Sequence, residues 1–199
     1  MVAVNPTLPK LATALAPLLP RLELPPAAAD ALAGAQTAAE GMDRLEAAGF
    51  RNEAVRLSAH ALPKREAVWW ACMCANAVPD PALPPADAAA RVAAEAWVRK
   101  PTDEGLRRAA WDAAQATDFR HPEAWAAMGA FWSGGSMAPE GQPVVPPADN
   151  LTGVAVSGAV VMASVRGRGE RSEARMGRFL AAARDIAAGG AGRIALEAD

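Results

Sequence analysis

Apolar side chains recur at intervals of three and four residues along most of the chain, the spacing that places them on one face of an α-helix. The C-terminal example is the most regular, and its members are Met176, Phe179, Leu180, Ala183, Ile186 and Ala187. Gly189 and Gly190 follow it and predict the end of that helix. β-Branched residues are sparse outside one segment, so the pattern favours helices over strands.

One stretch is apolar on every side rather than on one face. Residues 67–75 include Trp69 and Trp70 and carry no polar side chain. A helix of this kind is buried all round, and the stretch is much shorter than the roughly 20 residues that a membrane span requires. Pro63 and Pro79 mark its two ends. We therefore expect a central, Trp-rich helix with other helices packed around it.

Capping signals divide the N-terminal half of the chain into an antiparallel pair of helices. Thr37 and Glu40 form a capping box before the first helix. Gly49 has the character of a C-terminal cap, and the second helix begins near Glu53. Further helices are expected over residues 86–99, 104–117 and 122–132. Thr102 is the expected N-terminal cap of the middle one.

Residues 151–165 fit either a strand or a buried helix. The residues that favour a strand are Val154, Val156, Val160, Val161 and Val165. The small residues that favour a helix closely approached by its neighbours are Gly153, Ser157, Gly158, Ala159 and Ala163. A lone strand would have no partner in this chain, so we expect a helix.

Composition supports an all-α fold. Alanine, the best helix former, supplies much of the 52% apolar content, and tyrosine is absent. We expect a single globular domain of about seven to nine helices, with antiparallel helix pairs around the central buried Trp-rich helix. Residues 1–25 are expected to be a proline-interrupted arm that docks on the body, residues 26–190 the helical domain, and residues 191–199 a frayed tail.

Charge and ligand spacing exclude several classes of function. A net charge of −2 gives no electrostatic basis for binding nucleic acid or an acidic membrane. The local exception is residues 166–178, whose five arginines we interpret as a solvated face or as a patch for an acidic partner. The four candidate soft ligands, which are His60, Cys72, Cys74 and His121, do not have zinc spacing. No metal and no cofactor are therefore expected.

The one long irregular segment is residues 133–147, which contains three glycines and four prolines. Loops of this length in compact domains are usually functional or disordered. The residues expected to seal the core beside the helix that follows are Val144 and Val145. The residues expected to face outward at the loop tip are Ser136, Met137 and Glu140.

Residues 134–138 superficially match the G-x-S-x-G turn of serine hydrolases. That turn needs a strand before it and a catalytic histidine after it in the chain. Here a helix precedes the turn and both histidines lie upstream. We therefore expect no catalytic residue and lean against an enzyme. A small-molecule-binding or hydrolytic site at the same loop stays open as the alternative, with Ser133, Ser136 and Glu140 as its polar groups.

Two motifs resemble an uncharacterised bacterial all-helical domain family. The first is PKREAVWWAC, at residues 63–72. The second is FWSGGSMAP at residues 131–139, which continues through VVPP to LTG at residues 151–153. The resemblance extends from about Ala38 to Ile186. The family is a domain of unknown function and implies no catalytic residues, and its association with contractile secretion-system loci suggests a component of such a system as a partner.

Together these observations favour a non-enzymatic adaptor or accessory protein that binds another protein through loop 133–147 and the adjoining helix ends. The residues expected to form the binding surface are Trp132, Ser133, Ser136, Met137 and Glu140. We expect no membrane span and a cytoplasmic location, because Pro17 and Pro20 interrupt the only segment that has the shape of a signal peptide.

Overall fold

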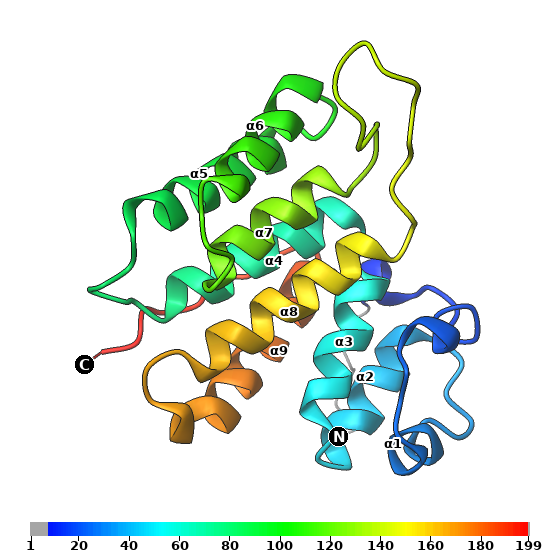
Figure 1. Ribbon diagram of the computed structural model, residues 1–199. Coiled ribbons are helices and arrows are strands. Elements are labelled where there is room, and N and C mark those ends of the chain that lie inside the picture. The colour runs from blue at the N-terminus through cyan, green and yellow to red at the C-terminus, as the bar shows by residue number, and fades with distance from the viewer. Residues whose placement is uncertain (1–7, 199) are drawn as a thin grey trace.

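The structure is a computed structural model that describes residues 8–198 (Figure 1). Within these residues it contains nine α-helices, three short 3-10 helices and no β-sheet. The α-helices are α1 (Pro26–Ala31), α2 (Ala38–Ala47), α3 (Arg51–Ala61), α4 (Lys64–Ala77), α5 (Pro85–Arg99), α6 (Glu104–Gln115), α7 (Pro122–Phe131), α8 (Leu151–Val165) and α9 (Ser172–Ala187). The 3-10 helices are η1 (Pro9–Leu11), η2 (Leu19–Arg21) and η3 (Gly169–Arg171). The expected single all-α domain is confirmed.

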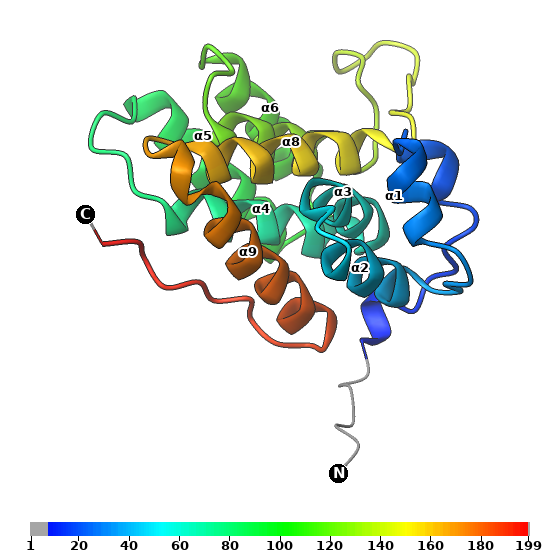
Figure 2. The ribbon, with the colours of Figure 1, turned by 90° about the horizontal axis from the view of Figure 1, so that it is seen from below.

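Helices α7 and α8 lie at the centre of the packing. α7 packs against α4, α5, α6 and α8, and α8 packs against α3, α4, α7 and α9. Figure 1 shows α5 and α6 on one side of α8 and the α2–α3 pair on the other. In Figure 2, α9 lies on the face of the bundle below α8. The fold thus brings distant parts of the chain onto one helix, α8.

Burial is more complete on α7 than on the Trp-rich helix α4. Every residue of α7 is buried except Trp125. On α4, Trp70 is fully buried and donates its indole N–H to the carbonyl of Phe179 at 2.8 Å. Trp69 and Met73 of α4 are only half-buried. The all-round burial expected for α4 is therefore confined to the sides that face its neighbouring helices.

The ambiguous segment 151–165 is the helix α8, as expected. Its buried residues are small or β-branched, and they are Thr152, Gly153, Ala155, Val156, Ala159, Val160, Ala163 and Ser164. A side chain at Gly153 would collide with the ring of His60 on α3, so glycine allows α3 and α8 to approach closely. Between residues 8 and 198, no helix combines the length and the apolar content that a bilayer span needs.

The N-terminal arm contributes to the same core as the helices. Its four core residues, Leu11, Leu15, Leu18 and Leu22, are all buried. The main-chain N–H of Leu15 donates to the carbonyl of Gln36 at 2.9 Å, and Ala38 donates to the carbonyl of Thr13 at the same distance. The part of the expected arm that precedes residue 8 lies outside the described residues.

The C-terminal segment does not fray where the structure describes it. We call residues 191–198 the C-terminal strap. Figure 2 shows the strap turning back after α9 and running toward the α4–α5 end of the molecule. The carbonyl of Ala191 accepts the indole N–H of Trp69 at 2.8 Å, and Glu197 N–H donates to the carbonyl of Ala77 at 2.8 Å. The expectation of fraying is corrected because Glu197 has charged partners on α9, described below.

Candidate functional site

The loop between α7 and α8 projects from one end of the molecule (Figure 1). Its two arms are joined by a hydrogen bond of 2.8 Å from the N–H of Met137 to the carbonyl of Val145. The hydroxyl of Ser136 accepts two further main-chain N–H groups, those of Ala138 and Val145, each at 3.1 Å. These bonds give the loop a defined shape without regular secondary structure.

Two arginines of α6 fasten the loop to the body. Arg107 is buried and donates to the carbonyls of Phe131 at 2.6 Å and Ser136 at 2.8 Å. Arg108 donates to the carbonyl of Ala138 at 3.2 Å. Because a guanidinium group donates in a fixed planar geometry, these contacts determine where residues 136–138 lie.

Glu104, one turn earlier on α6, orients both arginines. Its carboxylate lies 2.6 Å from Nε of Arg107 and 2.9 Å from Nε of Arg108. Hydrogen bonding to Arg107 is the main reason that the pKa of Glu104 is lowered. Gly135 has φ +64°, and a Cβ there would lie 2.7 Å from Nε of Arg107. In the sequence, the alternating acidic and basic residues of α6 predict only ion pairs on the surface of that helix. They do not indicate that its arginines hold the loop.

The residues expected to form the binding surface differ in their exposure. Glu140 is exposed at the loop tip, as expected. Met137 and Trp132 are half-buried and pack against the core. The carbonyl of Ser133 accepts a hydrogen bond of 3.0 Å from Nζ of Lys64. Of these side chains, only Glu140 is fully on the surface.

The two valines of the loop do not seal the core. Val144 is 74% exposed and Val145 is 47% exposed. The physical reason is that Arg107 and Arg108 hold the other arm of the loop against the body. Met137 therefore packs toward the core, and the arm of the loop that carries Val144 and Val145 lies on its solvent side.

A shallow cavity of about 330 Å³ lies between the base of the loop and the start of α6. It is the place where a small molecule could bind beside Ser133. Its cations already have partners within the protein: Lys64 donates to the Ser133 carbonyl, and Arg107 pairs with Glu104. The hydroxyl of Ser136 accepts main-chain N–H groups and receives no hydrogen bond from a histidine of the described chain.

The histidines and cysteines lie apart from the loop. Cys72 and Cys74 are fully buried, and burial raises the pKa of both thiols. His121 precedes α7, and its Nδ1 lies 3.4 Å from the carboxylate of Asp87. Among residues 8–198, no group of three histidine, cysteine or acidic side chains is arranged to hold a metal ion.

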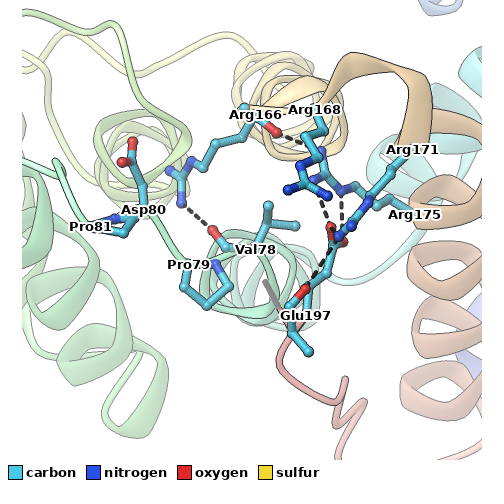
Figure 3. A pocket seen from close by; sticks show the side chains of 11 residues that line it. Val78, Pro79, Asp80, Pro81, Arg166, Arg168, Arg171, Arg175 and Glu197 are labelled. Atoms are coloured by element: carbon cyan, nitrogen blue, oxygen red, sulfur yellow. Dashed lines mark hydrogen bonds and ion pairs between the residues drawn. The ribbon is translucent and has the colours of Figure 1, made fainter.

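A second site lies where the end of α4, the turn between α8 and α9, and the strap meet (Figure 3). We call it the arginine cleft. It has a volume of about 290 Å³ and is lined by residues 78–81, 166–168, 171, 175, 197 and 198. Figure 3 shows Arg168, Arg171 and Arg175 gathered around Glu197, with Pro79 and Pro81 on the other side of the opening.

Glu197 of the strap is bound by several guanidinium groups. Nε and Nη2 of Arg175 each lie 2.8 Å from a Glu197 oxygen. Nη1 of Arg171 lies 2.6 Å away, and Nη1 of Arg178 lies 3.7 Å away. Hydrogen bonds from Arg175 and then from Arg171 lower the pKa of Glu197 to about 2. The carboxylate is therefore ionised at any physiological pH.

The cleft also contains arginines that support the fold. Arg166 pairs with the buried Glu123 at 2.5 Å and donates to the carbonyl of Val78 at 2.9 Å. Arg175 is buried as well, and it donates to the carbonyls of Ser164 at 2.9 Å and Arg166 at 2.6 Å. The run 166–178 is thus more than a solvated face, since two of its arginines connect α4, α7, α8 and α9.

Comparison with models of known protein families matches residues 41–187 to a family of unknown function, DUF6931. The chain belongs to this family. The resemblance to an uncharacterised domain family is thereby confirmed. A search of the curated proteins and a search of the solved structures give no match.

The DUF6931 match begins within α2 and ends with the last residue of α9. It contains all of loop 133–147 and all the arginines of the arginine cleft. Glu197, which the arginines bind, lies outside the matched residues. The loop and the arginines of the cleft therefore lie within the matched residues, whereas the strap lies beyond them.

Proposed function

We propose that this DUF6931 chain is a non-enzymatic adaptor that binds another protein through loop 133–147 and the adjoining helix ends. The observation that supports the proposal is that a hydrogen-bonded loop holds two neighbouring valines, Val144 and Val145, in solvent. Leaving apolar area exposed to water is unfavourable, at roughly 25 cal/mol per Å². A loop that is held in this state is better suited to contact with a partner than to stability.

The fixed shape of the loop also favours binding. A flexible loop loses conformational entropy when a partner orders it, and that loss weakens binding. Arg107, Arg108 and Ser136 already order the loop in the free protein. The exposed arm, residues 143–146, consists of two prolines and two valines and carries no charge, so the partner surface that fits it is an apolar groove.

Serine chemistry at the same loop is the weaker candidate. A nucleophilic hydroxyl needs a base within hydrogen-bond reach, whereas Ser136 is surrounded by main-chain donors. We place the adaptor in the bacterial cytoplasm, and a component of a contractile secretion system is the candidate partner that the resemblance suggests.

Site-specific photo-crosslinking tests the proposal. A photoreactive amino acid replaces Val144 in one variant and Val92 of α5 in the control, because Val92 is also an exposed valine, at 56%. We expect a specific crosslinked protein with position 144 and none with position 92. The protein identified by mass spectrometry is then purified, and its affinity for the native chain is measured.

Charge substitutions give the quantitative test with that purified partner. Val144→Asp and Val145→Asp should each weaken binding by about tenfold or more, the effect expected of a contact residue. Val92→Asp should not change the affinity, and all three variants should keep the native melting temperature. Equal crosslinking at positions 144 and 92, or unchanged affinity in both loop variants, would rule out the loop as the binding surface.

A further inference from the structure

The arginine cleft has the features of a second binding site, independent of the loop. We propose that it binds an acidic peptide segment of another protein, and that Glu197 of the strap occupies the site when that segment is absent. The inference does not depend on the adaptor function of loop 133–147, because the two sites are built from different elements.

Positive charge at the cleft exceeds what the strap neutralises. Four guanidinium groups, those of Arg168, Arg171, Arg175 and Arg178, lie at or beside the single carboxylate of Glu197. The other acid that lines the cleft is Asp80, across the opening, where it accepts the N–H of Ala82 at 2.9 Å. Arg168 has no ion pair with any residue between 8 and 198. A ligand with more negative charge than Glu197 is therefore favoured.

The contacts of the strap show that the cleft recognises main chain as well as a carboxylate. Glu197 N–H donates to the carbonyl of Ala77 at 2.8 Å. Nη1 of Arg171 donates to the carbonyl of Ala198 at 3.3 Å, and Arg178 donates to the carbonyl of Ala195. A free phosphate or acetate ion could not make these main-chain contacts. The chemistry therefore selects a peptide over a small anion.

The main donor of the site, Arg175, is held by contacts that do not involve Glu197. Arg175 is buried, and the carbonyls of Ser164 and Arg166 hold one end of its guanidinium group. Its Nε and Nη2 point at the two oxygens of Glu197, the bidentate geometry that makes arginine–carboxylate pairs strong and specific. This arrangement suits any acidic side chain that reaches the same position.

The strap is attached in a way that permits exchange. It contains no helix, Ile194 is half-buried, and Leu196 is 62% exposed. Gly189 and Gly192, with φ of +99° and +63°, set the path of the chain as it leaves α9. The cavity of about 290 Å³ beside Glu197 shows that the strap fills only part of the cleft. A longer acidic segment could therefore make contacts that the strap does not.

Fluorescence anisotropy with the full chain tests the proposal. The probe is a fluorescein-labelled, C-terminally amidated peptide that copies residues 194–198, Ile-Ala-Leu-Glu-Ala. The Glu197→Gln variant no longer fills the site with a carboxylate, so it should bind the probe about tenfold more tightly than the native chain does. Glu170→Gln is the matched control, since it removes a nearby exposed carboxylate outside the site, and it should behave as the native chain.

Two further arms establish specificity. A probe with glutamine in place of glutamate should lose its affinity for Glu197→Gln. Adding Arg171→Gln to that variant should weaken binding of the acidic probe.

In the native chain, an excess of unlabelled acidic peptide should accelerate tryptic cleavage after Arg193, because it displaces the strap. Equal binding to the native chain and to Glu197→Gln, no binding to either, or equal affinity of the acidic and glutamine probes would overturn the proposal.

Discussion

His60 lies where α3 meets α8, with its ring against Gly153. Burial, followed by the charges of Arg21 and Arg56, lowers the pKa of its imidazole to about 4. An unfolded histidine has a pKa near 6.5. Between these values the unfolded chain binds a proton that the native chain does not, so the free energy of unfolding should fall as the pH drops from about 6.5 to about 4.

Urea denaturation across this pH range measures the effect of His60. In His60→Gln the part of the pH dependence that falls between pH 6.5 and 4 should be absent, whatever the absolute stability of the variant. His121→Gln is the control and should keep it, because His60 is still present. The same pH dependence in the native chain and in His60→Gln would contradict the assignment.

The inward position of Met137 predicts an unequal response within the loop. Met137→Ala should lower the free energy of unfolding by about 1–2 kcal/mol, because it removes a side chain that packs against the core. Val144→Ala should change it by less than about 0.5 kcal/mol, because that side chain is 74% exposed. Denaturation midpoints of the two variants give the comparison. A larger loss in Val144→Ala would place the valine arm in the core after all.

At the scale of single residues, the sequence correctly predicts features that depend on residues close by in the chain, such as helix caps. Thr37 accepts the N–H of Glu40 at 3.2 Å, as the capping box indicates, and Gly49 has φ +84°. The start of α6 was predicted, but its cap is Asp103 rather than Thr102. The predicted burial of Val144 is wrong, because the arginines that determine its exposure lie on α6, distant in sequence.

Among the helices, α8 depends most on close approach. Gly153→Ala should destabilise the protein by about 1–3 kcal/mol, because the added methyl group would collide with the His60 ring. Gly158→Ala in the same helix is the control, since no atom of another helix lies within 4 Å of its added Cβ. It should stabilise by up to about 1 kcal/mol through helix propensity. Thermal unfolding of both variants measures the difference, and equal effects would mean that the α3–α8 contact is not tight.

The helices themselves were largely predictable. The prediction of a helix rather than a strand at residues 151–165 is confirmed. It rests on the fact that an isolated strand leaves its hydrogen-bonding groups unpaired. The sequence predicts the central position for α4, whereas α7 is the more completely buried helix. The apolar character of α7 comes mostly from alanine. An alanine-rich stretch predicts a helix, but it does not indicate how deeply that helix is buried in the core.

At the scale of the whole molecule, Glu197 of the strap binds Arg175 of α9 through its carboxylate and Ala77 of α4 through its main-chain N–H. Its contribution to stability should depend on pH with a definite sign. The pKa of Glu197 is lowered from 4.5 to about 2, so the native state favours the ionised form. That stabilisation is fully present above pH 4.5 and is lost as the pH falls toward 2.

The difference in unfolding free energy between the native chain and Glu197→Gln isolates this effect. It should be about 1–3 kcal/mol above pH 5, the range for hydrogen bonds to charged groups, and should shrink steadily toward pH 2. Urea titrations at several pH values measure it. A difference that stays constant down to pH 2 would mean that the arginines do not favour the ionised carboxylate.

The sequence predicts a solvated face or a patch for an acidic partner at residues 166–178, but it predicts neither the strap nor the cleft that the two form together. The run 166–178 is visibly rich in arginine, but its partners are Glu123 and Glu197, which are far away along the chain. Because residues 191–199 follow two glycines, the local sequence predicts a frayed end. Only the packing of α9 against α4 brings residue 197 beside residue 77.

Loop 133–147 is also a place where the chain could be cut into two fragments. It separates residues that form α1–α7 from residues that form α8 and α9. A cut after Gly141 would leave α8 as an apolar helix that needs α3, α4 and α7 to cover it. The two fragments, co-expressed, should therefore reassemble without a covalent link. The arginine cleft would re-form across the cut, with residues 78–81 from one fragment and the arginines from the other.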